Sequence, residues 1–498
     1  MPQNQTVKER KAFLVVRYYI RYPKHNIGKN IARFLTIIAL FLGTSCATYR
    51  PLPLTSEAIN ARLQPPDPAA LRVLAAQIKH PLLPPLELEP NQGLTPDSAA
   101  VLAVLLNPSL RAIRDQKAVA KAQLLEAGLL PNPELTYSLD VPTGGNTTGR
   151  VTAYGLGLDW DVTSLLSRAS GMEAAEKHEK AVDLQIAWQE WQVAQAAKGA
   201  VFQLLSLQMQ IKLVEQVCQR LVDDVTSIRK AVDQGAMTVS FLNTAQTASR
   251  RTRENLLDLE GQAAQQQLQL ERLLGLPTGT QVKLGKDIRL PFRVALPDEK
   301  VLYDGLEQRR LDLIALRLGY DSQEAAVRAA IMEQFPRLRI GPTISRDTDN
   351  VKTTGFGVNI EIPVLDRRQG RIAHERATRQ TLFDEYASRL FEARKDIEQV
   401  MSGLRYLDEQ IAAAQATEAD LGRMTDNYRE AVAAGLIEAP FYYAALEDFV
   451  SSQVRVFALQ GLLAQAEVAL ELAAGIYHIP QKPDQPPKAS SAQPKEEK

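Results

Sequence analysis

This chain of 498 residues has few aromatic residues, two cysteines and no net charge. Phe, Trp and Tyr make up 6% of it, and this composition favours long helices over a compact mixed core. The two cysteines, Cys46 and Cys218, exclude a framework of several disulfides. The formal net charge is zero. Nucleic-acid binding usually leaves a basic patch, so we expect no nucleic-acid partner.

The N-terminal apolar run, Phe34 to Leu42, is too short to span a bilayer. It follows a basic stretch and precedes Gly43-Thr44-Ser45-Cys46, an order typical of an export signal. We predict that residues 1–45 are a signal peptide and that Cys46 is the lipidated N-terminus of a bacterial lipoprotein. The alternatives are an uncleaved membrane anchor and a start codon assigned too early.

The middle of the chain contains one long unit twice. Residues 231–275 align with residues 431–475 without a gap, and the earlier part of the unit aligns at a spacing of 203. The slip of three residues falls between Leu135 and Gly155, where we expect an exposed loop because such loops tolerate insertions. Two copies of a long unit usually pack around a pseudo-twofold axis or line one shared object.

Composition divides the chain into segments. The proline-rich residues 46–94 predict an extended, lipidated arm, because proline interrupts helices. Repeat 1 is expected at 95–276 and repeat 2 at 299–477, joined by a linker at 277–298. The Pro-, Lys- and Ser-rich end predicts a disordered tail over 478–498.

Each repeat begins with a helix and continues with two strands. In repeat 1, Thr95 is the expected N-cap and Pro96 the first residue of a helix that runs to about Leu130. Apolar residues then occupy every second position in strand pairs at 135–162 and 338–362. The sequence therefore predicts four strands, each with one apolar and one polar face.

A very long helix follows each strand pair. From about Leu165 to Gln234 the chain has no proline and two glycines, which predicts a helix of roughly 100 Å at 1.5 Å per residue. Its later part has the alternate three- and four-residue spacing of a coiled coil: Ile211, Val214, Cys218, Leu221, Val225, Ile228 and Val232. At this core position Cys218 is expected to be a small buried hydrophobe. The chain turns back at Gly235, so each repeat ends in an antiparallel helical hairpin.

Four amphipathic strands cannot close a barrel by themselves. If the apolar face meets lipid, open edges are forbidden because no water satisfies the backbone. Transmembrane barrels have eight strands or more, so two or three chains are the minimum. A soluble antiparallel sheet whose apolar face is covered by protein is the alternative.

The order of these features resembles the TolC family of outer-membrane efflux proteins, over residues 95–477. The segments that carry the resemblance lead into and out of the strands and form the helix reversals: Gly128-Leu-Leu-Pro-Asn-Pro-Glu-Leu135, Phe335-Pro-Arg-Leu338, Gly357-Val-Asn-Ile-Glu-Ile-Pro-Val-Leu-Asp366, Gly235 with Phe241, and Gly435 with Phe441. The resemblance implies a mainly α protein with a transmembrane β-barrel portion. It implies a homotrimer with a 12-stranded barrel in the outer membrane and an α-helical periplasmic tunnel. It also implies two partners, a periplasmic adaptor and an inner-membrane transporter.

In this family the helix reversals form the tips that meet the adaptor. Carried over, the contacting residues are Gly235, Ala236, Met237, Thr238, Phe241, Gly435, Leu436, Ile437, Glu438 and Phe441. The family often places acidic residues six and nine positions after the tip glycine. Phe241, Thr244, Phe441 and Ala444 stand there instead. The expected constriction is therefore either apolar, at Phe241 and Phe441, or built from a substitute acid such as Glu438, Glu447 or Asp448.

The five histidines are scattered without ligand spacing, and no phosphate-binding glycine loop is present. We therefore expect neither an enzyme nor a cofactor or metal. The leading function is a passive outer-membrane duct for small toxic solutes, drugs or metal ions, in a tripartite efflux system. A conduit for type I protein secretion and a lipid-anchored periplasmic coiled-coil scaffold without a pore are the alternatives.

Overall fold

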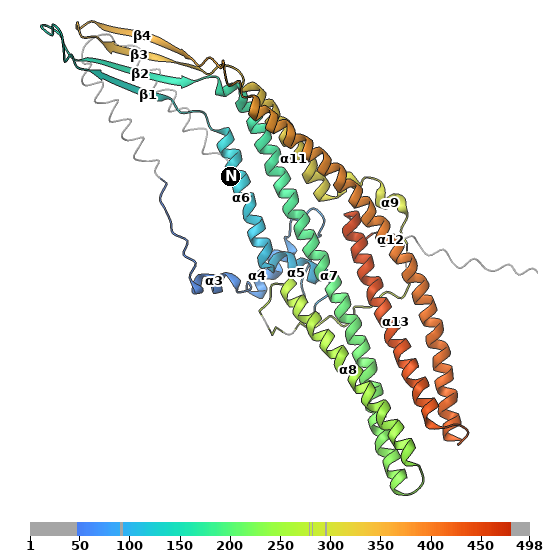
Figure 1. Ribbon diagram of the computed structural model, residues 1–498. Helices are drawn as coiled ribbons and strands as arrows, with labels where there is room; N and C mark the ends of the chain where they lie inside the picture. The colour runs from blue at the N-terminus through green and yellow to red at the C-terminus, as the bar shows by residue number, and fades with distance from the viewer. Residues whose placement is uncertain (1–46, 90–92, 278, 281, 294–295, 480–498) are drawn as a thin grey trace, which may run out of the picture. The chain divides into compact units, whose positions relative to one another are not determined.

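The computed structural model describes residues 47–89, 93–277, 279–280, 282–293 and 296–479 (Figure 1). The predicted signal peptide, Cys46 and most of the predicted tail lie outside these residues. The chain divides into two units, residues 1–64 and residues 65–498.

The proline-rich segment contains two short helices, so the prediction of an extended arm is wrong in part. In the first unit α3 spans Ser56–Leu63, and the Thr55 hydroxyl accepts a hydrogen bond from the backbone N–H of Ala58. In the second unit α4 spans Pro68–Ala76, with Asp67 as its N-cap. Here proline occupies the first helical position, where its missing N–H costs no hydrogen bond.

After α4 the chain packs on the helical body through a buried histidine. The Nε2 of His80 lies 2.9 Å from the carbonyl oxygen of Ala187, and its Nδ1 accepts from the N–H groups of Leu82 and Leu83. Burial lowers the pKa of His80, although the carbonyl of Ala187 and the carboxylate of Glu190 act in the opposite direction. A neutral imidazole suits this role, because a protonated Nδ1 cannot accept.

The four predicted strands form one antiparallel sheet in the order β1-β2-β3-β4. Their bounds are Glu134–Asp140, Ala153–Asp161, Leu338–Arg346 and Lys352–Ile360. Each repeat supplies one hairpin, and the hairpins join through β2 and β3. The three-residue slip falls in the region of the connections, as expected. The connections span 141–152 in repeat 1 and 347–351 in repeat 2 and differ by more than the slip, because β1 also ends three residues earlier in the repeat than β3 and β2 begins one residue later than β4.

The strand register confirms one apolar and one polar face. Leu135 lies opposite Leu158, Leu156 opposite Ile344, and Ile340 opposite Val358. The intervening pairs are small or polar: Thr136 with Gly157, Gly155 with Ser345, and Thr343 with Gly355. Because side chains alternate across a strand, the in-phase register gathers all four apolar rows on one side.

The helix predicted over 95–130 is wrong as a single element. It consists of α5, Pro96–Leu106, and α6, Pro108–Gly128. The side-chain oxygen of Asn107 caps α6 by accepting from Ser109 N–H at 2.9 Å, and its Nδ2 donates to the Leu273 carbonyl at 3.0 Å. Pro108 cannot donate to the preceding helix, so the break falls directly before it.

The structure contains the long helical hairpins that the sequence predicts. In repeat 1, α7 spans Ser164–Asp233 and α8 spans Val239–Leu273; in repeat 2, α12 spans Gln369–Ala433 and α13 spans Ala439–Ala474. The short helices α9, Glu299–Tyr303, and α10, Leu306–Arg309, lead into α11, Leu311–Met332. The 70 residues of α7 rise about 105 Å. Along this length α7 contacts α5, α6, α8, α11 and α13.

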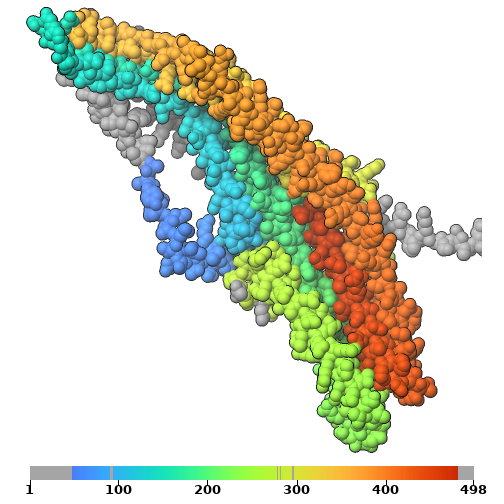
Figure 2. All heavy atoms as spheres, viewed as in Figure 1, coloured from blue at the N-terminus to red at the C-terminus, as the bar shows by residue number. Residues whose placement is uncertain are grey.

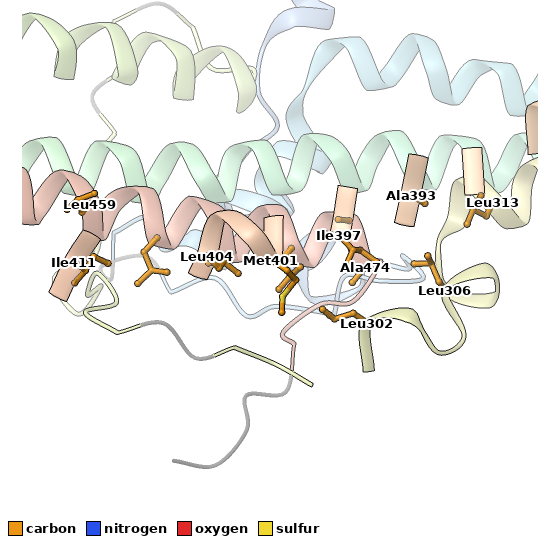
Figure 3. Close-up of a cluster of buried hydrophobic side chains, with 13 residues drawn as sticks. Leu302, Leu306, Leu313, Ala393, Ile397, Met401, Leu404, Ile411, Leu459 and Ala474 are labelled. Carbon is orange, nitrogen blue, oxygen red and sulfur yellow. The ribbon is translucent and has the colours of Figure 1, made fainter. Parts of the chain in front are cut away.

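The core follows the helix seams. The predicted heptad lies in one cluster, with Val214, Cys218, Leu221 and Ile228 buried. A second cluster joins α12 and α13 to the short helices before α11 and includes Leu404, Ile397 and Leu302 (Figure 3). By length and composition α13 would also pass as a membrane span, but half of its apolar window is buried inside the protein. We attribute its apolar character to packing on α12, α7 and α8.

We predict that Leu204→Ala destabilises the protein by about 2–5 kcal/mol, because it leaves a cavity in a filled core. Leu204 is 1% exposed and packs in a cluster with Leu270 and Leu274. The control is Leu436→Ala, which removes a side chain that is 77% exposed and should change stability by less than about 0.5 kcal/mol. Thermal unfolding of the two purified variants checks the difference, and equal losses would contradict the packing described here.

Candidate functional site

The two helix reversals have the same backbone geometry. Gly235 and Gly435 both have a φ of 71°. In each reversal the next residue's N–H closes a turn: Ala236 donates to the Ala231 carbonyl at 2.8 Å, and Leu436 donates to the Ala431 carbonyl at 2.9 Å. This left-handed cap favours glycine because a Cβ there is strained.

The residues that follow the two glycines differ in chemistry. Thr238 caps α8, and its hydroxyl accepts from the Phe241 N–H. Glu438 makes no side-chain cap at the start of α13, and Pro440 occupies the first turn there. Apart from the partly buried Ile437 and Phe241, the predicted tip residues are exposed: Gly235, Ala236, Met237, Thr238, Gly435, Leu436, Glu438 and Phe441.

The structure places the two tip phenylalanines in unlike surroundings. Phe241 is partly buried and packs edge-on against Tyr443, with ring centroids 6.5 Å apart. Phe441 is 57% exposed. Burial, with smaller contributions from Asp224 and Tyr442, raises the pKa of the Tyr443 hydroxyl. Within one protomer, Phe241 therefore serves the hairpin-to-hairpin packing, whereas Phe441 is free at the surface.

Of the acidic candidates for a constriction, Glu447 is held in an ion pair. Its Oε2 lies 3.2 Å from Arg251 Nη1, and both side chains are more than half exposed. The pair links α8 to α13 beside a cavity of about 320 Å³, which Tyr443 and Leu221 also line. Glu438 has no ion pair among the described residues, and Asp448 is exposed.

Sequence reasoning missed Arg251 and Tyr443. Both act between the two hairpins, and a periodicity of 200 residues relates equivalent positions rather than contacting ones. A weak signal exists in the sequence, since Arg250, Arg251 and Arg253 form a cluster of cations. The charge alone does not indicate which helix supplies the acid.

The sheet is the second surface of functional interest, because its apolar face is open. Tyr137 is 63% exposed and Phe356 66% exposed, and their neighbours on this face, Leu139 and Val358, are also exposed. Figure 2 shows the strands beyond the ends of the long helices. Among the described residues β1 and β4 each pair on one side. An apolar face of this size on a sheet with two open edges requires a partner.

Within the described ranges, no group of three or more His, Cys, Asp or Glu side chains is arranged to hold a metal ion. The buried polar groups instead join helices. An example is Arg310, which binds Asp312 through two hydrogen bonds of 2.9 Å and lies 4.8 Å from the ring of Trp188.

Comparison with known proteins agrees with this architecture. The sequence pattern of the family described as outer membrane efflux protein matches residues 100–276 and 302–476. No curated protein sequence matches the chain.

Solved structures resemble the fold at low sequence identity. CusC is 19% identical and has a TM-score of 0.63, with 81% of this chain and 100% of CusC covered. The outer membrane protein VceC of Vibrio cholerae is 18% identical with a TM-score of 0.64, over 76% of this chain and 96% of VceC. The open state of the MtrE outer membrane channel of Neisseria gonorrhoeae is 15% identical with a TM-score of 0.61, over 80% of this chain and 97% of MtrE.

The family pattern covers both repeats, and the neighbouring structures share the paired hairpins and the strands. The soluble sheet and the scaffold without a pore do not fit this family. The chain shares its fold with these channels and belongs to the outer membrane efflux protein family.

Proposed function

We propose that three copies of this chain close a 12-stranded barrel in the outer membrane and form a passive duct for small toxic solutes. An inner-membrane transporter supplies the energy, and a periplasmic adaptor joins it to the helix reversals. Cys46, outside the described residues, anchors each copy through lipid. The open apolar face of the four-stranded sheet is the observation that carries this proposal.

The unpaired backbone groups of the edge strands favour several copies. In hydrocarbon, the unpaired N–H and C=O groups of β1 and β4 have no water to bind. Pairing β4 of one copy with β1 of the next satisfies them and removes both edges. Two copies would reach the minimum of eight strands. We favour three because the resemblance to TolC-type channels implies a trimer.

The first prediction concerns the lipid face. Tyr137→Arg should prevent assembly of a conducting oligomer, because a cation facing lipid costs about 2–4 kcal/mol at the bilayer midplane and is repeated in each copy. Thr136→Arg, on the neighbouring position of the polar face, should still conduct. Native mass spectrometry and planar-bilayer recordings check both variants against a trimeric, conducting wild type. A monomeric wild type without conductance would overturn the proposed function.

A second prediction concerns the closed end of the duct. Arg251→Glu should raise the conductance several-fold, because two acids then face each other where Arg251 and Glu447 now attract. The unfolding temperature should hardly change, since an exposed ion pair contributes less than about 1 kcal/mol.

The exchanged double variant, Arg251→Glu with Glu447→Arg, restores the attraction and should return the conductance to that of the wild type. High salt should weaken the difference between the single variant and the wild type. Equal conductance in all three proteins would show that this pair does not limit the opening.

The third prediction concerns the adaptor. A photoreactive phenylalanine analogue at Phe441, on the second reversal, should form a covalent product with the adaptor in cells. The matched control is the same analogue at Phe292, which is 64% exposed and lies outside the helical hairpins. Products at both positions, or at neither, would contradict docking at the tips.

A further inference from the structure

A cavity of about 490 Å³ lies where α5, α7, α12 and α13 meet, away from the reversals and the sheet. Its lining is mixed: the apolar side chains Phe202, Pro297, Leu404, Val468 and Ile479 lie beside charged ones. Leu404 also belongs to the core cluster in Figure 3, so one wall of the cavity is fixed by the core. A cavity of this size suits a small organic molecule.

One side of the cavity carries a network of charges. Lys198 Nζ lies 2.9 and 3.1 Å from the two carboxylate oxygens of Glu471 and 3.6 Å from Asp97. The Tyr477 hydroxyl donates to Asp97 at 2.6 Å, and Lys198 also lies 4.9 Å from the Tyr477 ring. The positive charge of Lys198 is therefore balanced by the carboxylates of Glu471 and Asp97.

Glu467 lines the same cavity, one helical turn before Glu471 on α13. Among the described residues it has no hydrogen bond or ion pair. Burial raises the pKa of Glu467 to about 7; Glu471 adds to the shift, and Lys198 opposes it. Beside this network, the Oε1 of the buried Gln195 also lacks a donor, while its Nε2 donates to Glu471 at 3.2 Å.

The balance of charge decides which partner fits. Asp97, Glu467 and Glu471 face the cavity together with Lys198, and above neutral pH these four groups sum to a negative charge. His478, 3.7 Å from both Asp97 and Glu471, adds positive charge only when it is protonated. The described residues offer no metal-binding group here. An organic cation with an apolar body meets both the carboxylates and the walls.

We propose that this cavity is a binding site for amphipathic organic cations, in which the carboxylate of Glu467 pairs with the ammonium group and the apolar walls hold the rest. The site is separate from the duct proposed above and does not depend on it. Binding is favoured when Glu467 is ionised, so affinity rises with pH, and binding near neutral pH displaces a proton from Glu467.

The test is calorimetric titration of the purified full-length protein with benzyltrimethylammonium, with benzylsulfonate as an anion that has a similar apolar body. The cation should bind about tenfold more tightly at about pH 8.5 than at about pH 5.5, and the anion should not bind. Near neutral pH the measured heat should depend on the ionisation enthalpy of the buffer, because a proton is released.

Glu467→Gln should lose the pH dependence and the proton release, and it should weaken cation binding about tenfold at high pH. Glu430→Gln, which removes an exposed carboxylate of α12, is the matched control and should bind as the wild type does. Equal binding to the wild type and Glu467→Gln, equal binding of cation and anion, or no binding would each overturn the site.

Thermal unfolding shows that the variant is folded and tests the buried acid independently. A carboxyl whose pKa is raised in the folded state favours the native protein at low pH, and this contribution is lost as the pH rises through about 7. The stability of Glu467→Gln relative to that of the wild type should therefore increase as the pH is raised from acidic to alkaline. An unchanged difference across this range would contradict the partly buried, unpaired state of Glu467.

Discussion

The requirement that every backbone N–H and C=O in hydrocarbon be paired shapes the rest of this molecule. The four strands satisfy it internally at three pairings and leave it unmet at the outer edges of β1 and β4. The chain has no further strand among its described residues with which to cover these edges. In the duct that we propose, other copies pair with these edges, and the sheet alone then calls for an oligomer.

The helices have a different role, because they must position the strand hairpins of the two repeats side by side in one sheet. The long helix α7 contacts the helices of both repeats and serves as the spine. The two repeats are therefore not independent domains joined by a linker. The helices α11 and α13 of repeat 2 pack on α7 of repeat 1, and β2 of repeat 1 pairs with β3 of repeat 2.

Sequence patterns predicted the elements whose signal is periodic. The outer bounds of the two strand pairs agree with the expected ones within about two residues, and the heptad that includes Cys218 is buried as a seam. The break at Asn107 was missed because the apolar pattern continues across it. It depends on a hydrogen bond to Leu273, which lies 166 positions away.

The positions of the two helix reversals were predictable from the sequence, but the surroundings of their side chains were not. Glycine at 235 and 435 shows where the chain reverses, because the turn itself demands that residue. Phe241 and Phe441 occupy equivalent positions in the repeat, so the sequence does not show that one is partly buried and the other exposed. The difference arises because Phe241 alone meets Tyr443, on the partner hairpin. Contacts between hairpins require knowledge of which helices are neighbours.

The same inequality between equivalent positions supports closure by further copies. In α13 a Cβ on Gly461 would lie 2.6 Å from the Cβ of Ser206, so glycine lets α13 approach α7. The equivalent Gly261 in α8 has open space, with nothing within 4 Å of such a Cβ. Glu471 is neutralised by Lys198 of α7, whereas its equivalent Glu271 is buried with one oxygen unpaired among the described residues. Around a ring of copies, α8 would meet α12 of the next copy as α13 meets α7, and Gly261 would then gain the neighbour that it lacks. Glu398, not a cation, stands in α12 at the position equivalent to Lys198, so Glu271 would not gain the same ion pair.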